Sequence, residues 1–193
     1  MRQRIAQIGF SLIEVLVTIV IFSVGLLAVS VLQTVSKQAT FEAMQRTTAS
    51  HVAFGLLEDM RSNGPGLVAY VAKAQIGQGS ITATSAVDCT SMNTPCSGAE
   101  VAARDLWFWE TMLDGGMEAS PSGGVGGLVS PVACITGPAG GVAGMYTVTI
   151  AWRGTVGMTD LGLDVCGTTS GQYGTGNIFR RVLQVPTFID PNI

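Results

Sequence analysis

The residue types that carry enzyme chemistry are few in this chain and are poorly placed to act together. The only histidine, His51, lies in a helical pattern between a serine and a valine, and no glycine-elbow motif supplies a nucleophile for it. Glu58 and Asp59 are neighbours in sequence, so on a helix their carboxylates point in different directions. The glycines of residues 171–176 lack the strand-to-helix setting of a phosphate-binding loop, so we expect a plain loop there. The sequence therefore predicts no catalytic residue, no enzyme activity and no cofactor.

Four cysteines remain as candidates for covalent or metal chemistry, namely Cys89, Cys96, Cys134 and Cys166. A zinc site is disfavoured because the chain has no C-x-x-C pair and its one histidine lies far upstream, so we expect no bound metal. Disulfides are the natural alternative for an exported chain, and four cysteines allow three connectivities, which the sequence alone does not resolve. We favour Cys89 with Cys96, which closes a small loop, and Cys134 with Cys166, which tethers a glycine-rich tail to the sheet.

A single acid, Glu14, lies in an otherwise apolar segment. It is the only charged residue in residues 10–35, a segment long enough to cross a bilayer, for which about 20 residues suffice. Basic residues precede the segment, so the positive-inside rule places the N-terminus in the cytoplasm and exports the rest. A carboxylate in a membrane helix costs about 2 to 3 kcal/mol and calls for a partner. Cleavage after Gly9 would supply one, because the new amine of Phe10 would lie one helical turn from Glu14 or be offered by a neighbouring subunit.

The helical pattern continues beyond the apolar segment. Apolar residues recur at three- and four-residue steps over residues 49–60, while charged residues occupy the other faces. The sequence Asn63-Gly64-Pro65-Gly66 then supplies a glycine and a proline, which together end a helix. We expect one long helix that starts at about Phe10, is apolar over residues 10–35 and is amphipathic over residues 36–62.

A short basic leader that ends in Gly9, followed by Phe10-Ser11-Leu12-Ile13-Glu14 and an apolar helix, resembles the class III signal of type IV pilins and of the related pseudopilins of type II secretion. The resemblance implies that residues 1–9 are a leader peptide, removed by a prepilin peptidase between Gly9 and Phe10. It also implies that Phe10 becomes the N-methylated first residue of the mature chain. Glu14 is then the assembly carboxylate of the family.

Within that family, the stretch from Gly9 through Arg61 is similar to minor pilins of the PilV type, also called type IV pilus modification proteins. Three distal segments agree with this, at residues 105–109 (DLWFW), 146–152 (YTVTIAW) and 180–182 (RRV). Many major pilins have a proline partway along the first helix, whereas residues 10–62 contain none, which favours a minor pilin. The resemblance implies a subunit that primes or enters a type IV pilus with other minor and major pilins and a possible tip adhesin. Such a pilus serves motility and cell adhesion.

The expected location follows from the same resemblance and from the charge. It implies a single-pass protein of the bacterial inner membrane that then enters the pilus or stays at the periplasm or cell surface. The net charge of −3 and the scattered Lys and Arg residues argue against a nucleic-acid partner.

Two alternatives to a minor pilin stay open. One is a pseudopilin of type II secretion, whose leader would look the same, and the other is a signal-anchored periplasmic enzyme or binding module with a site in the distal loops.

Residues 63–193 should form the exported head. The sequence Ser97-Gly98-Ala99-Glu100 matches a capping box, so we expect a short helix over residues 98–114. Trp107 and Trp109 could form a binding platform, but an aromatic residue at helical core spacing more often packs in the interior. We therefore expect a core role for them.

Alternation of apolar and small polar residues predicts that the rest of the head contains strands. The expected strands cover residues 128–136, 146–152 and 178–185. Arg180 and Arg181 are expected on an exposed strand face. Together these elements predict an α+β, type IV pilin-like fold, in which the C-terminal half of the long helix packs on a small antiparallel sheet of three or four strands with glycine-rich loops.

Overall fold

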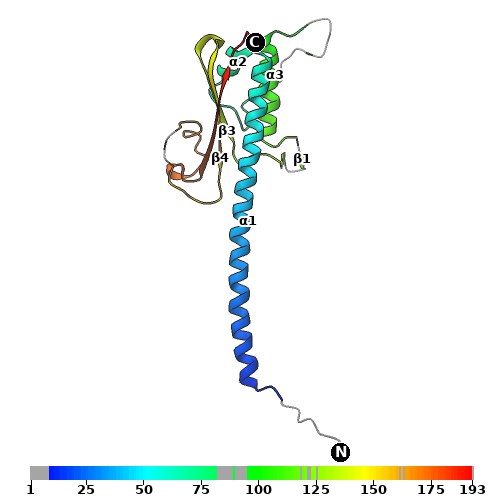
Figure 1. The fold of residues 1–193 in the computed structure, drawn as a ribbon, viewed down its shortest axis with the longest axis vertical. Coiled ribbons are helices and arrows are strands. Elements are labelled where there is room, and N and C mark those ends of the chain that lie inside the picture. Colours follow the sequence, from blue (N-terminus) through cyan, green and yellow to red (C-terminus); the bar gives the residue numbers. More distant parts are fainter. Residues whose placement is uncertain are drawn as a thin grey trace, which may run out of the picture. The chain divides into compact units, whose positions relative to one another are not determined.

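The fold is α+β and is built on one long N-terminal helix (Figure 1). The computed structural model describes residues 9–81, 89, 95–117, 119–120, 123–124, 126–160, 162 and 164–192. Two units are distinguished, one that ends at Phe41 and one that begins at Glu42. Helix α1 (Leu12–Ser62) contributes to both.

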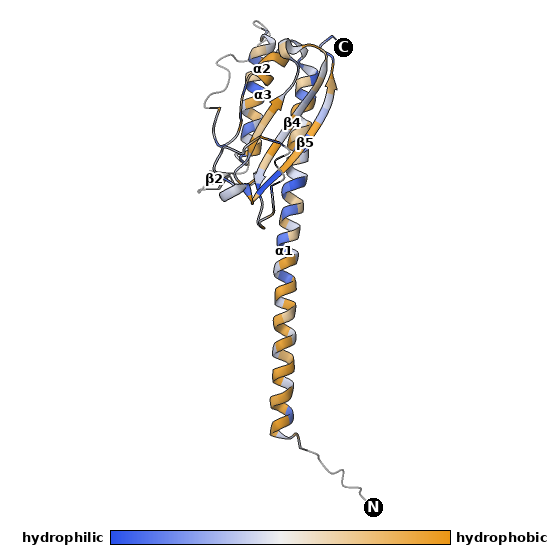
Figure 2. Cartoon of the chain, turned by 90° about the vertical axis from the view of Figure 1, so that its left-hand side faces the viewer, coloured by the Kyte–Doolittle hydropathy of each residue, from blue (hydrophilic) through white to orange (hydrophobic). Residues whose placement is uncertain are grey.

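In the first unit, α1 contains the apolar segment from Leu12 onward, and its large apolar side chains are exposed. Figure 2 shows this part of the helix as almost uniformly hydrophobic. It is the one helix among the described residues that is long and apolar enough to cross a membrane by length and composition. The helix begins at Leu12 rather than at the expected Phe10, because the carbonyl of Ser11 accepts the first helical hydrogen bond, from the N–H of Val15 at 3.3 Å.

In the second unit, the remaining turns of α1 are amphipathic, as the spacing predicts. The buried side chains recur at three- and four-residue steps. They are Gln45, Ala49, Val52, Ala53, Leu56, Leu57 and Met60. The helix ends at Ser62, and the glycine-proline cluster forms a single 3-10 turn, η1 (Gly64–Gly66), which leads into the short helix α2 (Leu67–Val71). No helix was expected over the residues of α2.

Helix α3 (Gly98–Leu113) packs beside α1 and confirms the predicted second helix. Its capping box is present, because the Ser97 side chain accepts from the N–H of Glu100 and the Glu100 carboxylate accepts from the N–H of Ser97. Trp109 is fully buried and donates its indole N–H to the backbone oxygen of Val52 at 2.7 Å. The predicted core role is therefore confirmed for Trp109, whereas Trp107 is only half-buried.

The head sheet has three antiparallel strands in the order β3 (Val132–Thr136), β4 (Gly144–Arg153) and β5 (Arg180–Ile189). Its central strand, β4, contains the predicted strand at residues 146–152. The even-numbered side chains of β4 join α1 and α3 in one hydrophobic core. They are Tyr146, Val148, Ile150 and Trp152. The helices and the sheet therefore bury each other's apolar faces.

The strand boundaries differ from the prediction for identifiable reasons. The strand expected at residues 128–136 starts only at Val132, because Ser130 has a φ of 49° and Pro131 has no N–H to donate to a ladder. The last strand continues past the expected end because Pro186 occupies a position opposite Thr147 where no N–H is required. A separate two-stranded ribbon was not anticipated. Its strands are β1 (Ala119–Ser120) and β2 (Gly123–Gly124).

The loop between β4 and β5 covers the face of the sheet that points away from α1. Its residues Cys166 and Tyr173 are buried against Val132 and Ala151 in a second, smaller hydrophobic cluster. The chain forms two disulfides, Cys89–Cys96 and Cys134–Cys166, which is the pairing that the sequence analysis favours. The second disulfide fastens this loop to β3.

Candidate functional site

The residues predicted to be processed lie at the start of α1. Gly9 and Phe10 are exposed and precede the first helical residue, and the Phe10 side chain is 84% exposed. A peptide bond outside a helix has no helical hydrogen bonds to break before a protease can bind it as an extended segment. The remainder of the predicted leader, residues 1–8, lies outside the described residues.

Glu14 lies in the first turn of α1, among exposed apolar side chains. Its backbone N–H donates to the oxygen of Ser11 at 3.0 Å, so the residue is helical. Its carboxylate has no hydrogen bond or ion pair with any described residue. A carboxylate in these surroundings needs a cationic partner if the segment enters lipid or a packed helix bundle.

Most other polar side chains of the apolar segment form hydrogen bonds within the helix itself. Four hydroxyl groups donate to carbonyl oxygens three or four residues earlier in the same helix, at distances from 2.8 to 3.1 Å. These are the hydroxyls of Thr18, Ser23, Ser30 and Thr34. Such back-bonded hydroxyls can enter an apolar environment without an unpaired donor. Glu14 is the only charged side chain of residues 10–35, and a charge demands an external partner in an apolar environment more strongly than the neutral Ser11 and Gln33 do.

Comparison with known families identifies the class of protein to which this arrangement belongs. A family model described as the prokaryotic N-terminal methylation motif matches residues 4–30, and one described as type IV pilin Tt1218 matches residues 31–107. The chain is a type IV prepilin-like protein. Searches of curated proteins and of solved structures return no match.

This assignment agrees with the fold, in which a long N-terminal helix packs on a small antiparallel sheet. The prepilin-like chain anchors in a membrane through its apolar helix and takes part in pilus assembly. Family membership indicates a structural protein rather than an enzyme.

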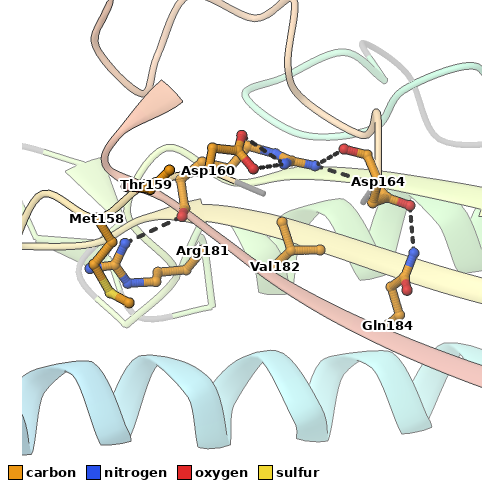
Figure 3. A pocket seen from close by; sticks show the side chains of 8 residues that line it. Met158, Thr159, Asp160, Asp164, Arg181, Val182 and Gln184 are labelled. Carbon is orange, nitrogen blue, oxygen red and sulfur yellow. Dashed lines mark hydrogen bonds and ion pairs between the residues drawn. The ribbon is translucent and has the colours of Figure 1, made fainter. Parts of the chain in front are cut away.

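The head of the prepilin-like chain contains a buried ionic cluster around Arg180, and Figure 3 shows the side chains of its two acids, Asp160 and Asp164. The guanidinium is 1% exposed and donates to both carboxylate oxygens of Asp160, at 3.1 and 3.0 Å. It also donates to the backbone oxygens of Cys166 and Asp164, at 2.9 and 2.6 Å. The N–H of Gly162, followed by Arg180, holds the pKa of Asp160 below its usual range. All of these groups are paired, so the cluster joins the β4–β5 loop to β5 and offers no free nucleophile or base.

The expectation that both arginines of the pair lie on an exposed strand face is wrong for Arg180, which is buried. Successive strand residues point to opposite faces, so Arg180 and Arg181 cannot share a surface. Arg181 points toward α1, where its guanidinium lies 3.4 Å from the carboxylate of Glu42. Asp160 and Asp164 in the preceding loop were the sequence signal for this burial, because a buried Arg requires acids to compensate its charge.

Glu42 fixes the same loop to α1. Its carboxylate accepts from the N–H and the hydroxyl of Thr155, at 2.6 and 2.9 Å. Burial alone would raise the pKa of Glu42, but the hydrogen bonds from Thr155 and the charge of Arg181 outweigh that effect and hold the pKa below its ordinary value. This acid is therefore an ionised structural anchor.

No catalytic or metal-binding constellation occurs within the part of the chain that the structure describes. His51 is exposed, and no group of three or more His, Cys, Asp or Glu side chains there could hold a metal ion. The loop expected at residues 171–176 consists of turns and leads into a short 3-10 segment, η3 (Thr175–Asn177).

Proposed function

We propose that this chain is a minor pilin of the PilV type, which enters or primes a type IV pilus or its tip complex. The observation that carries the proposal is Glu14, an unpaired carboxylate in the first turn of an exposed apolar helix. Such a helix is stable only in a bilayer or in a bundle of similar helices. The carboxylate gives the bundle a register, because it is stabilised where an amine of the same or a neighbouring subunit lies beside it.

Processing supplies that amine. In the proposed sequence of events, prepilin peptidase cleaves between Gly9 and Phe10 on the cytoplasmic side, and the new N-terminus of Phe10 is methylated. A methylated amine keeps its positive charge at neutral pH and so still pairs with Glu14. The inner membrane holds the chain, with its head exported, until the helix transfers to the growing filament. Other minor pilins, the major pilin and a tip adhesin are the proposed partners.

One feature favours a pilus subunit over a pseudopilin, and a second favours a minor pilin over a major one. The description of the matching family names a type IV pilin, which supports a pilus rather than a secretion fibre. The helix also lacks a proline, which many major pilins have partway along this segment. The two disulfides suit a head that is exposed outside the cytoplasm.

The test replaces Glu14 with alanine in a strain that lacks the native copy. We expect incorporation into sheared pili, relative to the amount in the membrane, to fall at least about tenfold, the equivalent of about 1.4 kcal/mol. Thr18→Ala is the matched control, because Thr18 is also polar and exposed on this helix but satisfies its hydroxyl internally. Mass spectrometry of the mature chain should show a methylated Phe10 as the first residue.

Unchanged pilus number and incorporation in the Glu14→Ala strain would refute the assembly role of that carboxylate. A mature chain that still begins at Met1 in cells with the peptidase would refute the prepilin processing. Loss of protein secretion with intact pili would instead identify a pseudopilin.

A further inference from the structure

The two edges of the head sheet differ in how they are covered. At the β3 edge, Ile76 donates to the oxygen of Ala133 at 2.9 Å and accepts from the N–H of Ala133 at 2.8 Å, so part of that edge is paired. At the other edge, β5 is 10 residues long and no described strand lies beyond it. An open strand edge presents unpaired N–H and C=O groups on which another strand can assemble.

The ladder shows which main-chain groups of β5 face outward. Gly154 donates its N–H to the oxygen of Phe179 just before the strand, and antiparallel pairs alternate between hydrogen-bonded and non-hydrogen-bonded. The register, with Arg180 opposite Arg153, then turns the main-chain groups of the even-numbered residues of β5 outward. Pro186 fits this phase, because it has no N–H to donate to β4.

The exposed part of this edge is the C-terminal half of β5. A pocket of about 390 Å³ lies beside the N-terminal half, where the aspartates of the β4–β5 loop already bind Arg180 and Gln184 (Figure 3). The backbone oxygen of Arg180 is also occupied, by the guanidinium of Arg181. Farther along the strand, Gln184, Pro186 and Phe188 are exposed, and Asp164 contacts the side chain of Gln184 rather than its main chain. No described residue hydrogen-bonds to their outward main-chain groups. We call residues 184–188 the open edge.

The side chains and charges around the open edge specify what would cover it. Phe188 lies directly across from Met145 on the outer face of the sheet, and these two side chains are 61% and 57% exposed. Residues 182–189 carry no charge. Asp190 follows them, and it binds only Asn192, with no cationic partner among the described residues. The complementary segment is therefore extended, uncharged and apolar beside Phe188, with a basic residue that reaches Asp190.

We propose that the open edge is a docking site for an extended segment of a neighbouring pilus subunit, which adds to the sheet as a fourth strand. The outward N–H groups of Gln184 and Phe188 donate to that segment, and the outward carbonyl oxygens accept from it. Pro186 accepts one hydrogen bond but offers none, which restricts the register of the added strand. This inference rests on the proposed function, because it assumes that the chain enters a filament.

The experiment compares Gln184→Pro with Gln184→Ala in the full-length chain, in a strain without the native copy. Both variants lose the Gln184 side chain, but only proline removes the outward N–H and places a ring where the added strand would lie. One net hydrogen bond corresponds to roughly a fivefold change in an equilibrium. We expect incorporation into sheared pili to fall about fivefold or more for Gln184→Pro and to stay within about twofold of wild type for Gln184→Ala.

Amide hydrogen exchange tests the same site without a mutation. The N–H groups of Gln184 and Phe188 should exchange more slowly in sheared pili than in the detergent-solubilised subunit. Charge reversal by Asp190→Lys should lower incorporation, and Asp190→Asn should lower it less. Equal exchange in the two states would overturn the proposal. So would equal incorporation of the two Gln184 variants, whether both match wild type or both are lost.

The Glu14→Ala variant distinguishes a failure of the docking proposal from a failure of the proposed minor-pilin function. If Glu14→Ala lowers incorporation and Gln184→Pro does not, only the docking site is wrong. If Glu14→Ala and deletion of the whole chain both leave pili unchanged, the minor-pilin function itself fails.

Discussion

Glu110 accepts more hydrogen bonds from one irregular segment of the head, residues 77–81, than any other described side chain does. Its side chain is buried, and its carboxylate accepts from the N–H groups of Gly77, Ser80 and Ile81, at 2.8, 2.7 and 2.8 Å. It also accepts from the hydroxyl of Ser80 at 2.6 Å. The bonded segment directly follows Ile76, which pairs with β3. Replacement of Glu110 by glutamine therefore tests how much one buried anion contributes to the stability of the head.

The expected magnitude follows from how the bonds divide between the two oxygens. Oε1 accepts three of them and Oε2 accepts only the bond from Ile81. A glutamine with its oxygen at the Oε1 position keeps three bonds in neutral form and places an NH₂ group against the N–H of Ile81. Hydrogen bonds to a charged group contribute about 1.5 to 3 kcal/mol and neutral ones about 1 kcal/mol. We expect Glu110→Gln to lower the free energy of unfolding by about 2 to 4 kcal/mol.

Urea unfolding of the full-length chain in detergent, followed by tryptophan fluorescence, measures this loss, since Trp109 is adjacent to the mutated position. Asp114→Asn is the matched control, because Asp114 accepts from the N–H groups of Gln78 and Gly79 in the same segment but is more exposed. Its loss should be below about 1.5 kcal/mol. A Glu110→Gln variant within about 0.5 kcal/mol of wild type, or no less stable than Asp114→Asn, would refute the reasoning.

Three further predictions concern the head. The contribution of Glu42 is complete above its ordinary pKa of 4.5 and is lost as the pH falls through the lowered pKa of the folded chain, so Glu42→Gln should flatten the acid limb of urea stability against pH. Arg180→Met should cost about 3 kcal/mol and make residues 154–178 more susceptible to limited proteolysis, since two acids lose their cation. Removal of the disulfide Cys134–Cys166 should cost about 3.5 kcal/mol in thermal unfolding and removal of Cys89–Cys96 about 2.5 kcal/mol, because the first closes the longer loop.

The elements that the sequence predicted well are those whose signals are local. The end of α1 follows from a glycine and a proline, and α3 follows from the capping box at Ser97 and the apolar spacing behind it. Strand β4 follows from strict alternation, because one of its faces meets the helices. In each case the decisive interaction lies within a few residues of the signal.

The features that could not be predicted from the sequence depend on residues that are distant in the chain. Arg180 is buried only because Asp160 and Asp164 fold back over it from the preceding loop. Strand β5 continues through Pro186 only because that residue falls in the outward phase of the ladder, which the register with β4 sets. Gln45 is buried because its side-chain amide bonds both Gly127 and Val129, more than 80 positions away in the sequence.

Glu14 and Glu110 show why one acid could be recognised from the sequence and the other could not. Glu110 is compensated by four donors that only the folded head brings together, so nothing near it in the sequence distinguishes it from a surface acid. Glu14 has no partner in the described chain, and its whole neighbourhood in sequence is apolar. The folded chain therefore leaves Glu14 without the compensation that an apolar environment requires. For that reason, substitutions at Glu110 should change the stability of the isolated subunit, whereas substitutions at Glu14 should leave that stability unchanged and alter only assembly.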